Sequence, residues 1–591
     1  MAATIDQVSG KTDTDSSTTG GGASGLTLAT RLSEDPALSV LLLEAGAANL
    51  EDPAILTPAA YGSHFGNPEY DWAFATEPQA NANGRAVPWP RGKGLGGSSA
   101  INFFQYHLAT KGDYDAIEKL GNPGWNWELF KKYQLKTETF IEPDVQDESI
   151  NYDLAHHGKE GPLAVSHAIT LSGLEKPFND SVAEFGIKPA KEPLSGDNKG
   201  TWLTPLTIHP KNRIRSYAAN AYYPLALTRK NITVLTNAHV VKLESTKDAN
   251  GILTATGVTF LHNKQTHLVS IGKEVVLSAG TIIDPQILEL SGIGDKKVLD
   301  KFNIEVKLDL PGVGNNIQEH VFFPATHEIR EEKKDQVNTF DSLLDPVERA
   351  KQIELFHKEG KGLLGMAFNV MAFATLSQLS PDTDAIYTEL EKTIEEGIAS
   401  GKYSPLQRKQ YQLQLDALKS GSPNCEFILT QGAPAVPGLA KPGKKYVSFF
   451  TFLNHPFSRG TIHIKSTDPL EHPAIDPHYF EEKYDIRLLM EVFKYSRRLA
   501  KTEPLKSYLQ DTEVLPGPEC QTDEQIANTI GSCSLVPLAD GGVVDTKLKV
   551  YNTTNIRVVD VSILPLHIGA HLQATAFTIG ELGADIIKGK I

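Results

Sequence analysis

The sequence predicts an α/β protein whose first domain is Rossmann-like, and three neighbouring features predict it. Residues 20–25 read G-G-G-A-S-G, in which Gly20, Gly22 and Gly25 form the pattern G-x-G-x-x-G. The following L-T-L-A-T-R-L is typical of a helix, and a short turn leads from it into the apolar run A-L-S-V-L-L-L-E. That run ends in Glu44, at the spacing where dinucleotide-binding domains carry an acid.

These residue types have a chemical reason to occur together. The glycines allow a tight turn and let a pyrophosphate approach the N-terminus of the helix, where free N–H groups and the helix dipole favour negative charge. An acid at the end of the second strand can accept hydrogen bonds from ribose hydroxyls. The pattern therefore indicates a nucleotide-binding turn.

The segment before this turn fits the pattern poorly. Residues 12–19 read T-D-T-D-S-S-T-T and contain no apolar side chain. The central strand of a doubly wound sheet is buried on both faces, so this octet is not expected to form it, and residues 1–19 are expected to be disordered. The N-terminus could be truncated or misassembled, or residues 1–5 or another segment could fill the position poorly. In each case the first strand of the sheet is predicted to be poorly formed.

A second glycine-rich stretch, residues 91–115, reads R-G-K-G-L-G-G-S-S-A-I-N-F-F-Q-Y-H-L-A-T-K-G-D-Y-D. Four glycines within six residues from Gly92 let the backbone approach a ligand closely. Two serines, Ser98 and Ser99, and a run of free N–H groups can surround the polar atoms of a large planar cofactor. We therefore expect this loop to form a wall of the cofactor site.

The remaining patterns predict further strands and helices. I-T-V-L-T-N-A-H-V-V-K-L-E alternates and is β-branched, and K-E-V-V-L-S-A-G is typical of a buried strand. C-E-F-I-L-T, Y-V-S-F-F-T-F-L and G-T-I-H-I-K predict a later group of strands. Helices are expected within residues 116–120, 128–136, 281–294, 382–419, 484–501 and 572–588.

Composition excludes several classes of function. Of 591 residues, 40% are hydrophobic and 22% are charged, as in an ordinary globular protein, and the net charge of −15 disfavours nucleic acid as a partner. There is no apolar run long enough to span a membrane and no secretory signal pattern, so a cytoplasmic location is expected, with secretion left open if the N-terminus is misassembled. The three cysteines, Cys425, Cys520 and Cys533, indicate neither a disulfide framework nor a metal site.

These pieces, in this order, resemble the glucose–methanol–choline (GMC) oxidoreductases, flavoproteins that include aryl-alcohol oxidases, glucose oxidases and choline dehydrogenases. Residues 92–115 fit the first family signature at every constrained position, including Asn102. Residues 280–294 match the second signature, except that Asp284 stands where Ser or Thr is usual. H-P-F-S-R-G-T-I-H-I and G-V-V-D…V-V-D-V-S-I-L-P also look like family segments. The resemblance runs from Gly20 to the C-terminus.

The resemblance implies two domains. A Rossmann-like FAD-binding domain would be assembled from residues 1–160, 226–320 and 530–591. A substrate-binding domain, built on an antiparallel sheet with helices, would comprise residues 161–225 and 321–529.

The resemblance also implies FAD as the cofactor. The binding is expected to be non-covalent, because Asn102 stands where some relatives carry a histidine that is attached to the flavin. Ala23 and Ser24 would lie at the pyrophosphate turn, Val240 would meet adenine through its backbone, and Asp560 would lie near the pyrophosphate and ribityl hydroxyls. The full set of implied cofactor residues is Gly20, Gly22, Ala23, Ser24, Gly25, Glu44, Gly97, Ser98, Asn102, Val240, Asp560 and Gln573.

In this family a histidine removes the hydroxyl proton of an alcohol while hydride passes to the flavin. An alkoxide is a better hydride donor than an alcohol, so a base whose pKa is close to neutral lowers the barrier. The resemblance assigns this catalytic role to His571, in G-A-H-L-Q, and places Gln573 beside the flavin. His567 is a weaker candidate for the pocket.

The resemblance implies two histidine positions for the base, of which His571 fills the second, and the histidine of the first position, the principal base in the family, is missing. Relatives carry it three residues before a segment that here reads G-S-C-S-L, residues 531–535, and that position holds Asn528. The approach to this segment is also shorter than in relatives, and Cys533 is expected to be a packing residue. The polar first strand and the missing histidine could both follow from a wrongly spliced gene, or could mark a member that has abandoned redox turnover.

Three functions stay open, because fold alone does not fix a reaction. The first is an FAD-dependent alcohol oxidase or dehydrogenase; Phe449, Phe450 and Phe452 would suit an aromatic alcohol but could equally be core. The second is a lyase or cyclase with structural FAD, as in hydroxynitrile lyases and versicolorin B synthase of the same family. The third is a flavin-binding protein without catalysis.

Overall fold

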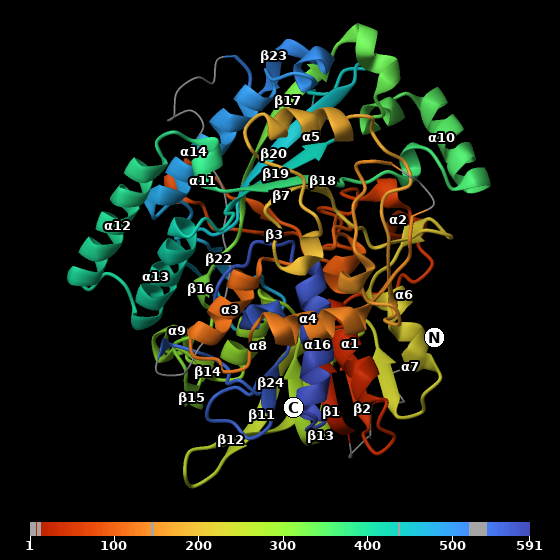
Figure 1. Cartoon of the computed structure of the whole chain (residues 1–591). Helices are drawn as coiled ribbons and strands as arrows, with labels where there is room; N and C mark the ends of the chain where they lie inside the picture. Colours follow the sequence, from red (N-terminus) through yellow and green to blue (C-terminus); the bar gives the residue numbers. More distant parts are fainter. Residues whose placement is uncertain (1–7, 9–13, 144–146, 435–437, 519–539) are drawn as a thin grey trace.

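The two main sheets of the molecule occupy its two halves. The computed structural model describes residues 8, 14–143, 147–434, 438–518 and 540–591. A seven-stranded sheet lies in the lower half of Figure 1 and a six-stranded sheet in the upper half. The predicted α/β class is thereby confirmed, while the domain boundaries given above stay a prediction.

The seven-stranded sheet has the order β10-β2-β1-β13-β12-β11, with β24 paired to β13 off this path. Strand β1 (Thr14–Thr19) lies in parallel between β2 (Val40–Leu43) and β13 (Gln265–Leu277). Strands β10 (Ile232–Leu235) and β24 (Ile556–Val558) add further parallel pairs. The antiparallel β12 (Leu253–His262) and β11 (Ala238–Lys247) complete the sheet. Three widely separated parts of the chain therefore meet in one sheet.

The expectation that residues 12–19 cannot form the central strand is wrong for residues 14–19. Ser17 pairs with Leu41 on one side and Val275 on the other, and Thr18 pairs with Leu42 and Val276. The flanking strands are apolar and supply both hydrogen-bonded edges, and threonine is itself a good strand former, so the tertiary context overrides the polar composition. The side chains of Ser16 to Thr19 are buried. The hydroxyls of Ser16, Ser17 and Thr18 have no hydrogen-bond partner among the described residues.

Helices cover this sheet and set the position of the glycine turn. α1 (Ala23–Leu32) follows β1 directly and packs against the C-terminal helix α16 (Gln573–Ile587). α16 also packs against α4 (Trp127–Thr137). Both α1 and α16 begin at residues of the predicted cofactor site, Ala23 and Gln573.

The six-stranded sheet is antiparallel throughout, as predicted for the second part of the chain. Its order is β23-β17-β20-β19-β18-β7, and its bounds are β7 (Gly200–Leu203), β17 (Val321–Ile329), β18 (Val370–Ala374), β19 (Cys425–Thr430), β20 (Tyr446–Leu453) and β23 (Leu509–Leu515). α14 (Lys483–Leu499) packs on β17 and β20. The predicted helical stretch 382–419 forms two helices, α12 (Thr383–Ala399) and α13 (Pro405–Lys419), because Ser404 caps a new helix with Pro405 at its first position.

The remaining α-helices of the described residues connect or flank the strands. They are α2 (Pro53–Leu56), α3 (Lys111–Lys119), α5 (Glu175–Ala183), α6 (Ala218–Ala221), α7 (Tyr223–Leu227), α8 (Ile283–Leu290), α9 (Lys296–Lys301), α10 (Pro346–Glu359) and α11 (Leu376–Leu379). The small sheets are formed by β3 (Phe74–Ala75), β4 (Pro88–Trp89), β5 (Glu138–Phe140), β6 (Leu163–Val165), β8 (Ile208–His209), β9 (Ile214–Arg215), β14 (Ile293–Gly294), β15 (Leu308–Asp309), β16 (Asn315–Ile317), β21 (Gly460–His463) and β22 (Ala474–Asp476).

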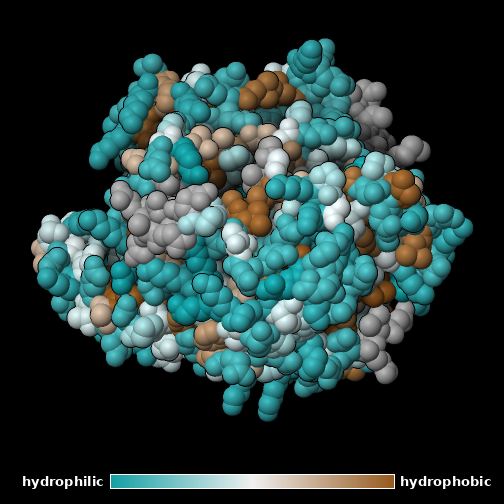
Figure 2. All heavy atoms as spheres, turned by 90° about the horizontal axis from the view of Figure 1, so that it is seen from above, coloured by the Kyte–Doolittle hydropathy of each residue, from teal (hydrophilic) through white to brown (hydrophobic). Residues whose placement is uncertain are grey.

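The surface above the six-stranded sheet is mainly hydrophilic. Figure 2 shows this face, with hydrophobic side chains gathered in small separate clusters. Within the described part of the chain, every helix is too short or too polar to cross a membrane.

Candidate active site

One cavity of about 450 Å³ is lined by both glycine-rich segments together with residues from 278–287, 319–320 and 560–576. Its wall includes all but one of the implied cofactor residues, and the exception, Gly25, is the third residue of α1. The cavity also reaches His320, His567 and His571. The chain therefore brings the predicted nucleotide turn and the predicted catalytic histidine to the same space.

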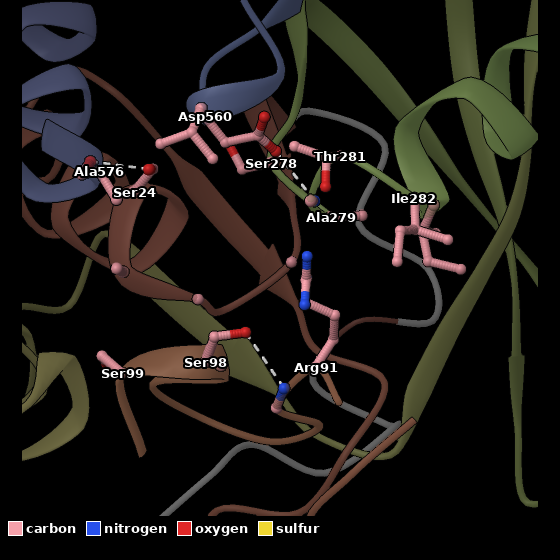
Figure 3. A pocket seen from close by; sticks show the side chains of 18 of the residues that line it. Ser24, Arg91, Ser98, Ser99, Ser278, Ala279, Thr281, Ile282, Asp560 and Ala576 are labelled. Atoms are coloured by element: carbon pink, nitrogen blue, oxygen red, sulfur yellow. Dashed lines mark hydrogen bonds between the residues drawn. The ribbon is translucent and has the colours of Figure 1, made fainter. Parts of the chain in front are cut away.

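The glycine turn forms one end of the cavity. Gly20 has a φ of +91°, and a Cβ there would lie 2.3 Å from the carbonyl oxygen of Ser278, so no other residue fits. The helix that follows has Gly22 at its N-cap and no side-chain cap, which leaves N–H groups of its first turn open toward the cavity. The Ser24 hydroxyl donates to the carbonyl oxygen of Ala576 at 2.7 Å (Figure 3). Ser24 therefore ties α1 to α16, and its hydroxyl hydrogen is not available to a phosphate oxygen.

Glu44 organises the backbone around the turn. Its buried carboxylate accepts hydrogen bonds from the N–H groups of Gly21 (2.7 Å), Gly46 (2.7 Å) and Gly94 (3.0 Å). Burial raises the pKa of Glu44, and these three donors act in the opposite direction. A carboxylate has more acceptor sites than these bonds occupy, so Glu44 can still bind a ribose hydroxyl at the cavity wall.

The second glycine-rich loop passes very close to the first. The short 3-10 helix Gly97–Ala100 begins next to the turn, and a Cβ on Gly97 would lie 2.8 Å from the Cα of Gly22. Ser98 Oγ accepts from the Gly92 N–H at 3.1 Å (Figure 3). Asn102 Nδ2 donates to Gln573 Oε1 at 2.7 Å, which joins this loop to the start of α16. Val240 lines the cavity from β11.

Two acids meet where the second family signature departs from its usual residue. Asp560 accepts from the N–H groups of Gly280 and Ser562, each at 2.9 Å, and Asp284 accepts from the neighbouring Ala279 N–H at 2.8 Å. Burial, reinforced by the charge of Asp560, raises the pKa of Asp284 well above its usual value. Asp284 is therefore a buried acid whose charged form is disfavoured, in the position of the usual hydroxyl residue.

His571 lies at the other end of the cavity and is paired with an acid. Its Nε2 is 2.8 Å from Oε1 of Glu426, which is fully buried on β19. Burial opposes the ionisation of Glu426, but the facing His571 outweighs it and holds the pKa of the carboxyl below its usual value. The His571 backbone N–H donates to Nε2 of His107 at 3.2 Å. This is an acid–histidine pair of the kind that orients a general base.

Further histidines surround this pair. The ring centroid of His571 lies 5.4 Å from that of His320 and 5.4 Å from that of His107. Burial lowers the pKa of His107 to about 4 and that of His567 to about 3, so both are neutral at neutral pH. Candidate metal ligands also occur here, because donor atoms of His320, Glu426 and His571 lie within 4.8 Å of one another. These three residues come from distant segments, so their spacing in the sequence gave no sign of a metal site.

Sequence reasoning missed Glu426, His320 and His107. Glu426 lies inside the predicted strand C-E-F-I-L-T, where a lone acid among apolar residues was the available signal. His107 lies within the glycine-rich loop itself, five residues after Asn102. The predictions for Asn528, Cys520, Cys533 and residues 531–535 lie outside the described residues. Cys425 is a buried free cysteine on β19.

Comparisons with known proteins identify the family of the chain. Residues 15–322 and 456–580 match two family models that are both described as GMC oxidoreductase. The chain is 34% identical over 595 residues to the GMC oxidoreductase family protein Mala s 12 of Malassezia sympodialis, with 96% of this chain and 91% of the relative covered.

Solved structures show the same fold. An FAD-dependent oxidoreductase from Chaetomium thermophilum matches with a TM-score of 0.86 and 28% identity, covering 97% of this chain and 99% of that one. A fungal aryl-alcohol oxidase matches with a TM-score of 0.84 and 29% identity, covering 98% and 99%. The two family models and a relative this similar along nearly the whole chain show that the protein belongs to the GMC oxidoreductase family.

Proposed function

We propose that this protein is an FAD-dependent oxidoreductase that oxidises the CH–OH group of a small alcohol. The observation that carries the proposal is that one cavity connects the open N-terminus of α1 with His571, which is paired with the buried Glu426. A dinucleotide cofactor and a base are the two components that such a reaction requires.

The residues at the cavity fit FAD. The uncapped first turn of α1 suits a pyrophosphate, and the absence of side chains at Gly22 and Gly97 lets two loops approach a ligand closely. Glu44 would hold the ribose, and Asp560 would lie at the pyrophosphate and ribityl part. We propose non-covalent binding, because the Asn102 amide is not a nucleophile and is already hydrogen-bonded to Gln573. The uncapped N-terminus of α16 would favour negative charge on the flavin edge.

When bound, FAD would accept the hydride from the alcohol carbon. The chain itself supplies the proton acceptor. Because Nε2 of His571 is held by Glu426, its Nδ1 is the nitrogen left to take the hydroxyl proton. The Glu426 carboxylate then stabilises the imidazolium that forms, in a buried setting where the attraction between the two charges is strong. Since His107 and His567 stay neutral, neither repels that new positive charge strongly.

Aromatic side chains near the base support an aryl alcohol as the substrate. The ring of Phe452 lies 6.0 Å from that of His571, and Phe65 and Phe103 line the cavity. Phe449, in contrast, is fully buried in the main core. Of the three phenylalanines named from the sequence, Phe452 is the one whose ring lies beside His571, but it is buried and does not line the cavity, so Phe65 and Phe103 are the side chains proposed to face the substrate.

The test is to purify the protein, identify any released cofactor after denaturation, and add aryl and other primary alcohols to the holoprotein without oxygen. The proposal expects unattached FAD and loss of the long-wavelength flavin absorption with at least one alcohol. Bound FAD that no alcohol reduces would contradict alcohol oxidation and would favour a lyase or cyclase. Purified protein that neither contains nor takes up FAD would contradict the proposal as a whole.

A further inference from the structure

Arg215 is a fully buried arginine at the end of β9, and it has no acidic partner. Its side chain is among the largest that are completely enclosed. Among the described residues no carboxylate lies within ion-pair distance of its guanidinium, and its Nη2 lacks any hydrogen-bond partner. Arginines are rarely buried without a counter-ion, because removing a charge from water is costly. The fold therefore keeps an uncompensated positive charge in its interior.

Neutral oxygen atoms of the cofactor loop hold this charge in place. Nη1 of Arg215 donates to the carbonyl oxygen and to Oδ1 of Asn102, both at 2.9 Å, and to the carbonyl oxygen of Ser99 at 3.3 Å. Its Nε donates to the carbonyl oxygen of Ile55 at 3.0 Å. The guanidinium carbon lies 3.8 Å from the centroid of the Phe104 ring. Burial lowers the pKa of Arg215 to about 9, which leaves it charged at neutral pH.

The same contacts fix the orientation of two amides at the cavity wall. Because Oδ1 of Asn102 accepts from Arg215 and from the Phe104 N–H, its Nδ2 must face Gln573. Gln573 then accepts through Oε1 and donates through Nε2 to Thr207 Oγ1 at 2.9 Å. Arg215, Asn102 and Gln573 form a chain of oriented dipoles that runs from the buried charge to the cavity. Asn102 and Gln573 both line that cavity.

We propose that Arg215 is a positioning residue that raises the reduction potential of the bound flavin, by holding a positive charge behind Asn102 and aligning the Asn102–Gln573 amides. The inference rests on the proposed binding of FAD. Two-electron reduction adds negative charge to a flavin at neutral pH, and a nearby buried positive charge stabilises that form more than the oxidised form. The missing counter-ion of Arg215 is then the reduced cofactor itself.

The test measures the reduction potential of the bound flavin in the holoprotein, by equilibrating it with a reference dye during gradual reduction. Arg215→Gln and Arg215→Met remove the charge, whereas Arg215→Lys keeps it but loses the planar fork. We expect the two neutral variants to lower the equilibrium constant for reduction of the flavin at least tenfold. For a two-electron couple this corresponds to a reduction potential that is lower by about 30 mV. Arg215→Lys is expected to stay within threefold of the wild type. Phe104→Leu disturbs the same site while leaving the charge, and it serves as the matched control with an unchanged potential.

A wild-type potential in either neutral variant would overturn the inference, as would an equal loss in Arg215→Lys and Arg215→Gln. If the neutral variants fail to fold, Arg215→Lys is sufficient for the test. A tenfold lower equilibrium constant for flavin reduction in Arg215→Lys would show that the positive charge does not set the potential. These outcomes differ from failure of the proposed function, which would appear as a wild-type protein without FAD.

Discussion

Replacing Thr18 by valine should stabilise the protein, although Thr18 lies at the centre of the main sheet. Thr18 pairs with Leu42 and Val276, is fully buried, and its hydroxyl has no hydrogen-bond partner among the described residues. Valine has nearly the same shape and a higher preference for strands. The substitution removes an unpaired buried polar group, whose burial costs about 1–3 kcal/mol.

The expected gain from Thr18→Val is therefore about 1–3 kcal/mol in the free energy of unfolding. The assay is urea unfolding of the protein without cofactor, read as a shift of the transition midpoint at constant slope. The control is Thr430→Val on β19, another buried strand threonine, whose hydroxyl donates to the carbonyl oxygen of Ser448 at 3.0 Å. This control should lose about 1 kcal/mol. If Thr18→Val destabilises the protein as much as the control does, then the Thr18 hydroxyl is satisfied and our account of the first strand is wrong.

Three further predictions concern the cavity. The Asp284 carboxyl has a raised pKa in the folded state, so the free energy of unfolding of the wild type should fall as the pH rises above about 4, by up to about 1.4 kcal/mol per pH unit. The substitution Asp284→Asn removes this carboxyl. In thermal unfolding without cofactor, the advantage of Asp284→Asn should thus grow with pH, whereas the exposed control Glu51→Gln should show no such trend. Gly97→Ala should abolish FAD binding in a fluorescence titration while the far-UV circular dichroism stays native, because the added Cβ would lie 2.8 Å from the Cα of Gly22; retention of wild-type affinity would refute the close approach of the two loops. Glu426→Gln should lower kcat about 10- to 100-fold with little change in KM, since the carboxylate acts on the imidazolium after the substrate is bound; a pure KM effect would remove Glu426 from the proton transfer.

Local sequence patterns singled out residues of both glycine-rich segments that the structure brings to one end of the cavity. The spacing from Gly20 to Glu44 and the glycines near Gly97 encode a turn, a helix start and a strand end, which are features of short chain segments. In the structure these residues line one cavity, although their individual contacts with FAD stay predictions. The same local reasoning failed for β1, because whether S-S-T-T can form a buried strand depends on Leu41, Leu42, Val275 and Val276, which flank it from distant parts of the chain.

The base side of the cavity could be predicted only in part. His571 was singled out through its motif, but its partner Glu426 lies 145 residues away in sequence, on β19 of the six-stranded sheet, and no spacing rule connects them. Arg215 gave no signal at all, because an arginine in a polar loop is usually exposed, and only the fold shows that it is enclosed. Asp284 was visible as a departure from a signature, but its raised pKa follows from its burial and from the nearby Asp560, which only the fold shows.

The most direct test of the central claim is the rate of flavin reduction in a single anaerobic turnover, measured for the wild type and His571→Ala with an alcohol that reduces the wild-type protein. Loss of a positioned base lowers the rate of such a reaction by about 10²- to 10⁴-fold. His571→Ala should therefore bind FAD normally, and its flavin should be reduced at least 100 times more slowly. A variant that binds FAD and is reduced at the wild-type rate would contradict the claim that His571, held by Glu426, removes the hydroxyl proton.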